Sequence, residues 1–265
     1  MSIMLARLLA PLLLATSLFA QATPSPSLSG IAHVAIRVKD LDASVGFYEK
    51  LGFVRAFALS KDGKVYEAFI KINDHQFIEL YPATEKDPQI GFLHLCFYGA
   101  DLNSVHDFYV AQGLTPNQVR TAGAGNLLFT MPGPLSPTGP QNIEYTQYMP
   151  GSLHSKDVGQ HLGPDRIANE LTSVTLAFTD PPAAKAFYLD KMHFPSSLTL
   201  PGASTEAVAI TPLAPLGHKA RFTLAADPRR SAATLQTRLV PFTRDTQGLL
   251  LLDPDQNEIV IAPQP

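Results

Sequence analysis

The stretch of sequence that decides the fold runs from Gly30 to Phe53 and reads GIAHVAIRVKDLDASVGFYEKLGF. Its first half, Ile31 to Val38, alternates in polarity and predicts a half-buried strand with His33 on the more polar face. Asp40 or Asp42 is placed to cap a helix, and apolar residues then recur at helical spacing. The stretch therefore predicts a strand followed by a short amphipathic helix.

A second copy of this pattern runs from Gly91 to Gly113 and reads GFLHLCFYGADLNSVHDFYVAQG. His94 precedes Asp101 by seven residues, as His33 precedes Asp40. An echo at fixed spacing indicates an internal repeat, so both copies are expected to form the same unit.

Each copy ends in a predicted strand that carries one carboxylate. Glu79 lies in the segment FIELY, 46 residues after His33, and Glu144 lies in NIEYT, 50 residues after His94. The two copies thus supply two imidazoles and two carboxylates at corresponding positions.

At these residues the sequence resembles the vicinal oxygen chelate superfamily, which includes glyoxalase I, methylmalonyl-CoA epimerase, extradiol dioxygenases and fosfomycin-resistance proteins. The resemblance covers about Gly30 to Tyr148 and is carried by HV-x-I-x-V-x-D-L, FY-x-x-LGF, and the strand endings IEL and IEY. It implies βαβββ modules, two of which form a cupped sheet around a divalent metal. It also implies that the glyoxalase I ligand pattern falls on His33, Glu79, His94 and Glu144.

The sidedness of the strands supports a metal at these residues. Glu79 shares its face with Phe77 and Tyr81, and Glu144 shares its face with Asn142. Two carboxylates that converge on one concave surface require a cation or shared protons, because buried charges are costly. Two imidazoles and two carboxylates suit one divalent ion such as Zn, Ni, Co, Mn or Fe. The alternative is that these are ordinary core or surface residues. Many members of this fold bind small molecules without a metal.

The repeated pattern returns more weakly after residue 170 and predicts a third and a fourth module. The expected elements are strands at 172–179, 207–211, 221–225 and 258–261, with helices after Asp180 and Asp227. The four ligand positions are expected to fall on Ser173, Ala209, Ala220 and Val260, none of which holds a metal well. Glu258 and His218 lie nearby but are expected to be out of register. The second half is therefore predicted to be a degenerate copy.

These patterns predict an α+β protein in which four βαβββ-type modules pair into two vicinal-oxygen-chelate-like domains with cupped mixed sheets. The expected organisation is a signal peptide (1–22), a disordered lead-in (23–29), a glyoxalase-like domain with the metal site (30–148), a connector (149–169) and a degenerate glyoxalase-like domain (170–265).

The N-terminus predicts export to the periplasm or the extracellular medium. Arg7 gives a short basic flank, Leu8 to Ala15 is apolar, and Ala20-Gln21-Ala22 fits a cleavage site between small residues. The apolar run is too short for a confident membrane span, so no stable span is expected after cleavage. An uncleaved anchor is the alternative.

Composition narrows the function further. A net charge of −3, a pI of about 6.2 and 16% charged residues provide no basic patch, so no nucleic-acid partner is expected. The single cysteine, Cys96, has no intramolecular partner and is expected to be buried or to line the pocket. The loop Pro132 to Pro140 is expected to be a substrate lid or a simple surface connection. The remaining histidines are expected at the surface or in linkers, and they are His75, His106, His154, His161, His193 and His218.

The resemblance and the ligand set together imply a metal-dependent lyase or isomerase. An ion that chelates adjacent oxygens of a small-molecule substrate stabilises enolate charge and eases removal of the neighbouring C–H proton. Glu144 or Glu79 is then the expected general base. Arg37 and Tyr98, each four residues after a histidine and on the same face, are expected substrate contacts, with rim residues as the alternative.

Two other functions remain open. An extradiol-type dioxygenase needs a His, His, carboxylate triad, which His33, His94 and Glu144 supply, with Glu79 as an additional carboxylate. A non-catalytic protein that sequesters a small molecule needs no metal. Export also argues against glutathione or CoA thioesters as substrates, since both are mainly cytosolic.

Overall fold

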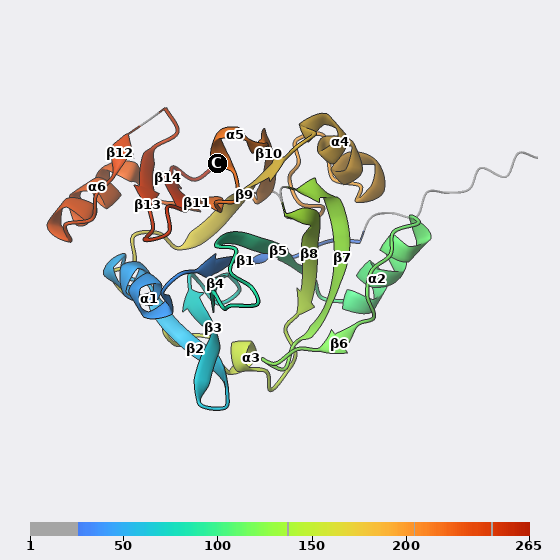
Figure 1. The fold of residues 1–265 in the computed structure, drawn as a ribbon, viewed down its shortest axis with the longest axis horizontal. Coiled ribbons are helices and arrows are strands. Elements are labelled where there is room, and N and C mark those ends of the chain that lie inside the picture. The colour runs from blue at the N-terminus through green and yellow to red at the C-terminus, as the bar shows by residue number, and fades with distance from the viewer. Residues whose placement is uncertain (1–25, 137, 204, 245) are drawn as a thin grey trace, which may run out of the picture.

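Two mixed β-sheets, one of eight strands and one of six, form the body of the molecule in the computed structural model (Figure 1). The structure describes residues 26–136, 138–203, 205–244 and 246–265. The expected signal peptide of residues 1–22 lies outside the described residues. Among the helices that are described, none has the length and apolar character needed to cross a bilayer.

The first module follows the predicted order of elements. Asp40, rather than Asp42, caps the first helix by accepting a hydrogen bond from the Ala43 N–H at 3.0 Å. Asp62 and Gly63 both have positive φ angles, which suits the tight hairpin that the Asp-Gly pair predicts. The elements are β1 (Gly30–Val38), α1 (Leu41–Lys50), β2 (Val54–Lys61), β3 (Lys64–Lys71) and β4 (Phe77–Pro82).

The second module repeats this order. Its elements are β5 (Gly91–Tyr98), α2 (Leu102–Ala111), β6 (Arg120–Thr121), β7 (Leu127–Ser136) and β8 (Gly139–Gln147).

The segment 132–140, expected to be a substrate lid or a simple surface connection, is part of a β-hairpin. The described residues of the segment 132–140 belong to the β7–β8 hairpin, which carries a register shift between Pro132 and Leu135. Pairing with β8 extends β7 through the prolines because edge positions and bulges tolerate them.

The two modules join through their first strands. The first sheet has the order β2-β3-β4-β1-β5-β8-β7-β6, so β1 and β5 lie side by side at its centre. In each module the last strand is parallel to the first, and β1 is antiparallel to β5. Helix α1 packs on β2, β3 and β4, and α2 packs on β7 and β8, so both of these helices lie on one face of the sheet (Figure 1).

The connector, expected at 149–169, contains one short helix, α3 (Leu153–Lys156). Buried Lys71 holds this segment to β3. Its ammonium group donates to the Asp157 carbonyl at 2.6 Å and to the Gln160 carbonyl at 2.7 Å. It also forms ion pairs with Asp157 (2.7 Å) and Asp74 (2.8 Å).

The second sheet repeats the architecture with losses. The third module has no full hairpin before its last strand, and a single bridge between Thr199 and Ala207 stands there instead. The sheet order is β10-β9-β11-β14-β13-β12. The elements are β9 (Glu170–Phe178), α4 (Pro181–Ala186), the π-helical turn η1 (Phe187–Lys191), β10 (Ala207–Pro212), α5 (Leu213–Leu216), β11 (Arg221–Ala225), α6 (Pro228–Thr237), β12 (Thr243–Arg244), β13 (Leu249–Leu252) and β14 (Glu258–Ala262).

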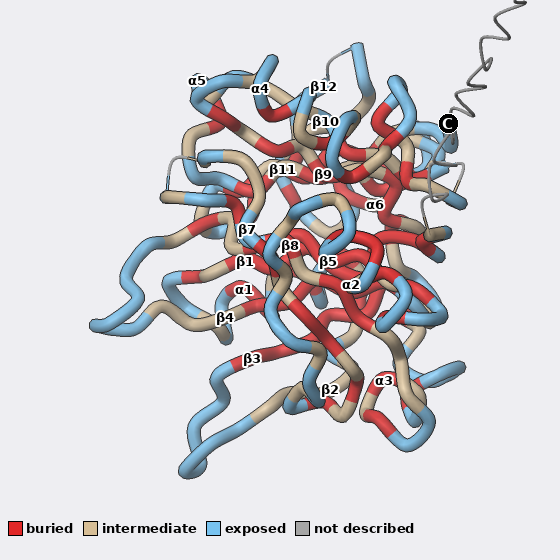
Figure 2. Tube along the Cα trace, turned by 90° about the vertical axis from the view of Figure 1, so that its right-hand side faces the viewer, coloured by how far each residue is buried: buried red, intermediate tan, exposed pale blue. Residues whose placement is uncertain are grey.

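One hydrophobic core runs through the strands of both sheets, as the buried segments in Figure 2 show. The described part of the lead-in differs from the expected disorder. Leu28 is buried, and its N–H donates to the Pro201 carbonyl at 2.7 Å, while the Ser29 N–H donates to Tyr98 at 2.8 Å. Burial of the Leu28 side chain between the two sheets offsets the entropy lost when these residues are ordered.

Candidate metal centre

The four side chains expected to bind a metal come from four adjacent central strands. Glu79 lies on β4, His33 on β1, His94 on β5 and Glu144 on β8. Because alternate residues of a strand share a face, the register of these strands places all four side chains on the concave surface. His33 opposes Cys96 across the β1–β5 pair, and Cys96 in turn opposes Glu144.

The two histidines lie close to each other, and each glutamate lies close to both histidines. His33 Nδ1 lies 2.9 Å from Glu79 Oε1, and His33 Nε2 lies 3.0 Å from His94 Nε2. Glu144 Oε1 lies 3.5 Å from His33 Nε2. Nε2 of His94 lies 3.9 Å from Glu79 Oε2 and also 3.9 Å from Glu144 Oε2. The structure therefore brings together all four side chains that the sequence paired.

Burial makes this cluster electrostatically unfavourable in the absence of a cation. Burial raises the pKa of Glu79 to about 8 and that of Glu144 to about 7, the latter against the opposing effect of His33. The pKa of His33 is lowered by burial, although the Glu144 charge raises it. Burial and the neighbouring His33 hold the pKa of His94 well below its usual value. A divalent cation would reverse the two carboxylate shifts by favouring the ionised glutamates, and it would favour the neutral imidazoles as burial already does.

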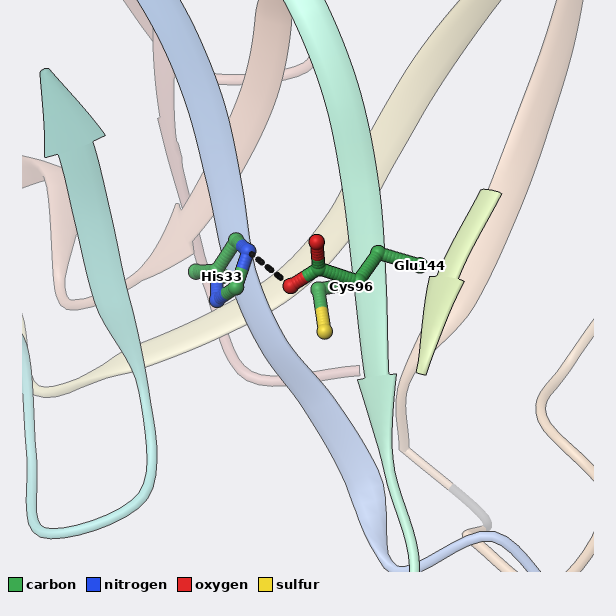
Figure 3. Close-up of side chains that lie close together, drawn as sticks. All are labelled: His33, Cys96 and Glu144. Atoms are coloured by element: carbon green, nitrogen blue, oxygen red, sulfur yellow. Dashed lines mark ion pairs between the residues drawn. The ribbon is translucent and has the colours of Figure 1, made fainter. Parts of the chain in front are cut away.

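Cys96 lies in the same cluster, fully buried beside His33 and Glu144 (Figure 3). Burial raises the pKa of the Cys96 thiol well above its usual value, and the Glu144 charge acts in the same direction. The side chain is therefore a neutral thiol in the floor of the site, which agrees with the expectation that it is buried.

A third carboxylate, which the sequence analysis missed, lies beside the four residues. The Tyr81 hydroxyl is 2.7 Å from Glu67 Oε1 and 3.1 Å from Glu79 Oε2, so it links the two glutamates. Burial, followed by the Glu79 charge, raises the pKa of Glu67 to about 8. Glu67 could have been identified from the alternation of residues along β3, which places it on the same face as buried Phe69.

The connector covers one end of the site. The Leu153 N–H donates to the Ala124 carbonyl at 2.8 Å, which ties α3 to the loop before β7. His154 was expected at the surface or in a linker, and it is buried in this connector. Its ring stacks on Tyr148 at 4.9 Å, and its Nδ1 lies 2.8 Å from Asn126 Nδ2.

A cavity of about 220 Å³ lies over the cluster. Its walls include His33, Glu67, Glu79, Glu144 and His154. The Nε2 atom of His154 is buried and has no hydrogen-bond partner among the described residues. Arg120, on β6, is the exposed cation among the residues that line this cavity.

Neither expected substrate contact lines this cavity in the part of the chain that the structure describes. Arg37 forms a 3.7 Å ion pair with Asp87. Tyr98 packs against the rings of His75 (5.7 Å) and Tyr148 (5.6 Å), and of these three residues Tyr148 lines the cavity. Substrate contact by Arg37 and Tyr98 stays a prediction.

The second sheet has a corresponding cavity with different side chains. The strand register equates Ser173, Ala209 and Val260 with ligand positions, as expected, but it equates Arg221 rather than Ala220 with His94. The link from this position to the helix cap is one residue shorter than in the first sheet. Arg221 forms a 2.5 Å ion pair with Glu258, which lies in register on the same face and not out of register as expected.

In the described part of the second sheet, the residues at the four corresponding positions therefore do not form a set of metal ligands. Both groups of three or more metal-binding side chains found among the described residues lie in the first sheet: His33 with Glu79 and His94, and His33 with Cys96 and Glu144.

Comparison with known proteins agrees with this architecture. The model of the Glyoxalase/Bleomycin resistance protein/Dioxygenase superfamily matches residues 30–144. No curated protein matches the sequence significantly.

Solved structures resemble nearly the whole chain. The 2,3-dioxygenase LapB from Pseudomonas sp. KL28 has a TM-score of 0.63 at 14% identity, covering 90% of this chain and 93% of its own. The Mn(II)-bound glyoxalase from Novosphingobium aromaticivorans has a TM-score of 0.62 at 16% identity, covering 89% and 82%. Homoprotocatechuate 2,3-dioxygenase from Arthrobacter globiformis has a TM-score of 0.63 at 17% identity, covering 92% and 82%.

At these identities the likeness establishes the fold, a two-domain vicinal-oxygen-chelate arrangement of two mixed sheets. Residues 30–144 of this chain therefore match the model of the Glyoxalase/Bleomycin resistance protein/Dioxygenase superfamily, and the similar solved structures share the fold of the paired modules.

Proposed function

We propose that the first sheet carries a divalent-metal-dependent lyase or isomerase that removes a proton from a small substrate with two adjacent oxygens. The observation that carries this proposal is the convergence of two imidazoles and two carboxylates, His33, Glu79, His94 and Glu144, from four neighbouring strands.

These four residues would hold the metal. Bonds of about 2.0–2.2 Å to nitrogen and oxygen place neighbouring ligand atoms roughly 3–3.5 Å apart. The Nε2 atoms of His33 and His94 lie 3.0 Å apart, and the nearest glutamate oxygens lie 3.5 to 3.9 Å from one or the other of them. When bound, such an ion polarises substrate oxygens and stabilises the negative charge that develops on them.

The carboxylates supply the proton acceptor. Glu79 or Glu144 takes the substrate proton, since both carboxylates line the cavity over the cluster. Glu67 shares the Tyr81 hydroxyl with Glu79 and provides a second buried oxygen pair at the same end of the cavity. It lies outside the four ligands and is therefore free to exchange the proton with Glu79.

The cavity limits the substrate to a small molecule. Its volume of about 220 Å³ is below the range of about 300–1,000 Å³ typical of drug-sized ligands. His154 Nε2 supplies a polar atom without a protein partner, and Arg120 supplies a positive charge. These features suit a short α-hydroxy-carbonyl compound with an anionic end.

Elemental analysis of the purified protein tests the proposal. The parent protein is expected to contain about one equivalent of a transition metal, and a His33→Ala, Glu144→Ala double variant is expected to lose it while keeping its circular dichroism spectrum. A His106→Ala, Glu49→Ala variant, altered on the two helices outside the cavity, is the matched control and should retain the metal.

The result that would overturn the proposal is absence of metal from the parent after incubation with Zn, Ni, Mn, Co and Fe(II). The non-catalytic sequestering function would then stand. A metal-loaded parent is to be assayed with α-hydroxy-carbonyl, thiohemiacetal and catechol substrates.

Extradiol ring cleavage is the second candidate. His33, Glu79 and His94 form a buried His, His, carboxylate group, so the carboxylate of the triad would be Glu79 rather than the expected Glu144. Oxygen consumption with catechol by Fe(II)-loaded protein supports this candidate, whereas turnover of an α-hydroxy-carbonyl compound under anaerobic conditions supports the lyase or isomerase.

We also propose export. The observation behind it is the basic, apolar and small-residue pattern of residues 1–22. N-terminal sequencing of the protein from the periplasm or culture medium should begin at Thr23, and recovery of an intact N-terminus in the cytoplasm would contradict it.

A further inference from the structure

A second polar cavity, of about 420 Å³, lies between the connector and helix α6, away from the candidate metal centre. Its walls come from the segment 164–169, the end of β11 and the first turns of α6. Three arginines, Arg166, Arg230 and Arg238, line it.

The three guanidinium groups carry uncompensated positive charge. Among the residues that the structure describes, none of the three forms an ion pair. Arg238 donates only to backbone carbonyls, those of Asp165 (2.7 Å) and Lys50 (3.4 Å), and Arg166 donates to the carbonyl of Gly163 (2.8 Å). Neutral carbonyl acceptors fix these side chains in place without neutralising their charge.

Two of the groups retain unused donors. The Nε atom of Arg166 is buried and has no hydrogen-bond partner among the described residues. Arg230 is exposed and its side chain makes no hydrogen bond to the described part of the chain, so all five of its guanidinium N–H donors are available. A buried N–H donor without an acceptor costs free energy unless a ligand or water satisfies it.

The carboxylates at this cavity do not neutralise the arginines. The Asp227 carboxylate caps α6 by accepting a hydrogen bond from the Arg229 N–H at 2.9 Å. Asp165 bonds Arg238 through its backbone carbonyl rather than its side chain. The cavity therefore has three cations and two acidic groups that are not paired with them.

We propose that this cavity binds a small oxyanion ligand, a molecule that carries phosphate or carboxylate groups. Planar guanidinium groups that are held in place match such oxygens with paired N–H donors. The volume lies within the range of about 300–1,000 Å³ typical of small-molecule sites. This proposal is independent of the metal centre and of its reaction.

Titration calorimetry at low ionic strength with inorganic phosphate and with citrate tests the proposal. The parent is expected to bind at least one of the two, and the preferred one distinguishes a phosphate ligand from a carboxylate ligand. Arg230→Gln is expected to weaken binding about tenfold or more, since it removes a charged hydrogen-bonding partner. Because the Arg230 side chain forms no hydrogen bond or ion pair with the described part of the chain, this variant should fold as the parent does.

Arg229→Gln is the matched control, because Arg229 precedes Arg230 on the same helix and does not line the cavity. It should leave the affinity unchanged. No binding of either anion to the parent would overturn the proposal. Equal weakening by Arg229→Gln and Arg230→Gln would also overturn it, because that result indicates general surface attraction.

Discussion

Glu67 is the residue whose environment differs most from what its sequence position indicates. It lies on a hairpin strand, yet its carboxyl is buried beside Glu79 and its pKa is about 8. A glutamate with a folded-state pKa above its unfolded value stabilises the fold at low pH, and this stability is lost as pH rises through the folded pKa.

The metal-free protein is therefore expected to lose stability between about pH 4.5 and pH 8, on the order of a few kcal/mol, because Glu67, Glu79 and Glu144 ionise in a buried site. Glu67→Gln should reduce this loss, as measured by urea unfolding of chelator-treated protein across this pH range. Glu49→Gln, an exposed change on α1, should leave it as in the parent. An unchanged pH dependence in Glu67→Gln would contradict the assignment.

Metal affinity should rise with pH over the same range. The ligand carboxylates must be ionised to bind, so binding should release protons below pH 8. Competition with a chromophoric chelator at pH 5.5, 6.5 and 7.5 measures this effect, for which a tightening of about tenfold or more is expected. An affinity independent of pH would mean that these carboxylates are not ligands.

At the scale of elements, the connector depends on Lys71. Its ammonium group has no exposed surface and lies between Asp74, Asp157 and the Gln160 carbonyl. Lys71→Met should destabilise the protein by about 3 kcal/mol, because it removes the ammonium group from buried Asp157 and leaves that carboxylate only His161 as a partner. Lys64→Met, on the exposed part of the same strand, is the control.

Limited proteolysis tests whether Lys71 holds the connector in place. Cleavage between 150 and 169 should become faster in Lys71→Met and stay slow in Lys64→Met. If global stability falls but the connector is not cleaved earlier than the rest of the chain, Lys71 does not specifically hold the connector.

The elements predicted correctly are those decided by local chemistry. The Asp caps of the helices and the Asp62-Gly63 turn depend on residues next to them in the chain. The grouping of the four clustered side chains was also predicted, because the two histidines and the two glutamates occupy corresponding positions in the two copies of the repeated pattern. The order of Leu28 and the choice of Arg221 over Ala220 as the counterpart of His94 were not predicted, since both depend on contacts with distant parts of the chain. Glu67 and His154 have no counterpart in the repeat that could have identified them.

At the scale of the whole molecule, the two sheets share one core. Tyr48 on α1 bonds Asp253 at 3.3 Å, and Tyr188 on η1 bonds Gln141 at 3.0 Å. Phe97 and Phe194 pack across the junction with ring centroids 5.7 Å apart. The sheets are therefore expected to stabilise each other.

Calorimetry should show a single cooperative unfolding transition for the full mature chain. A chain that ends at residue 148 should be unfolded or aggregated, because its buried face toward the second sheet would be exposed to water. Two separate transitions, or a folded and soluble fragment, would show that the first sheet is an independent domain.

The one sulfhydryl group of the sequence lies at the floor of the site, fully shielded from solvent. The reactivity of this thiol can therefore serve as a probe of the site. An aromatic thiol-labelling reagent can reach Cys96 only when the central strands separate, so the rate of labelling reports how often the site opens. Slower labelling after addition of a divalent cation would measure, without any substrate, how strongly that cation holds the two modules together.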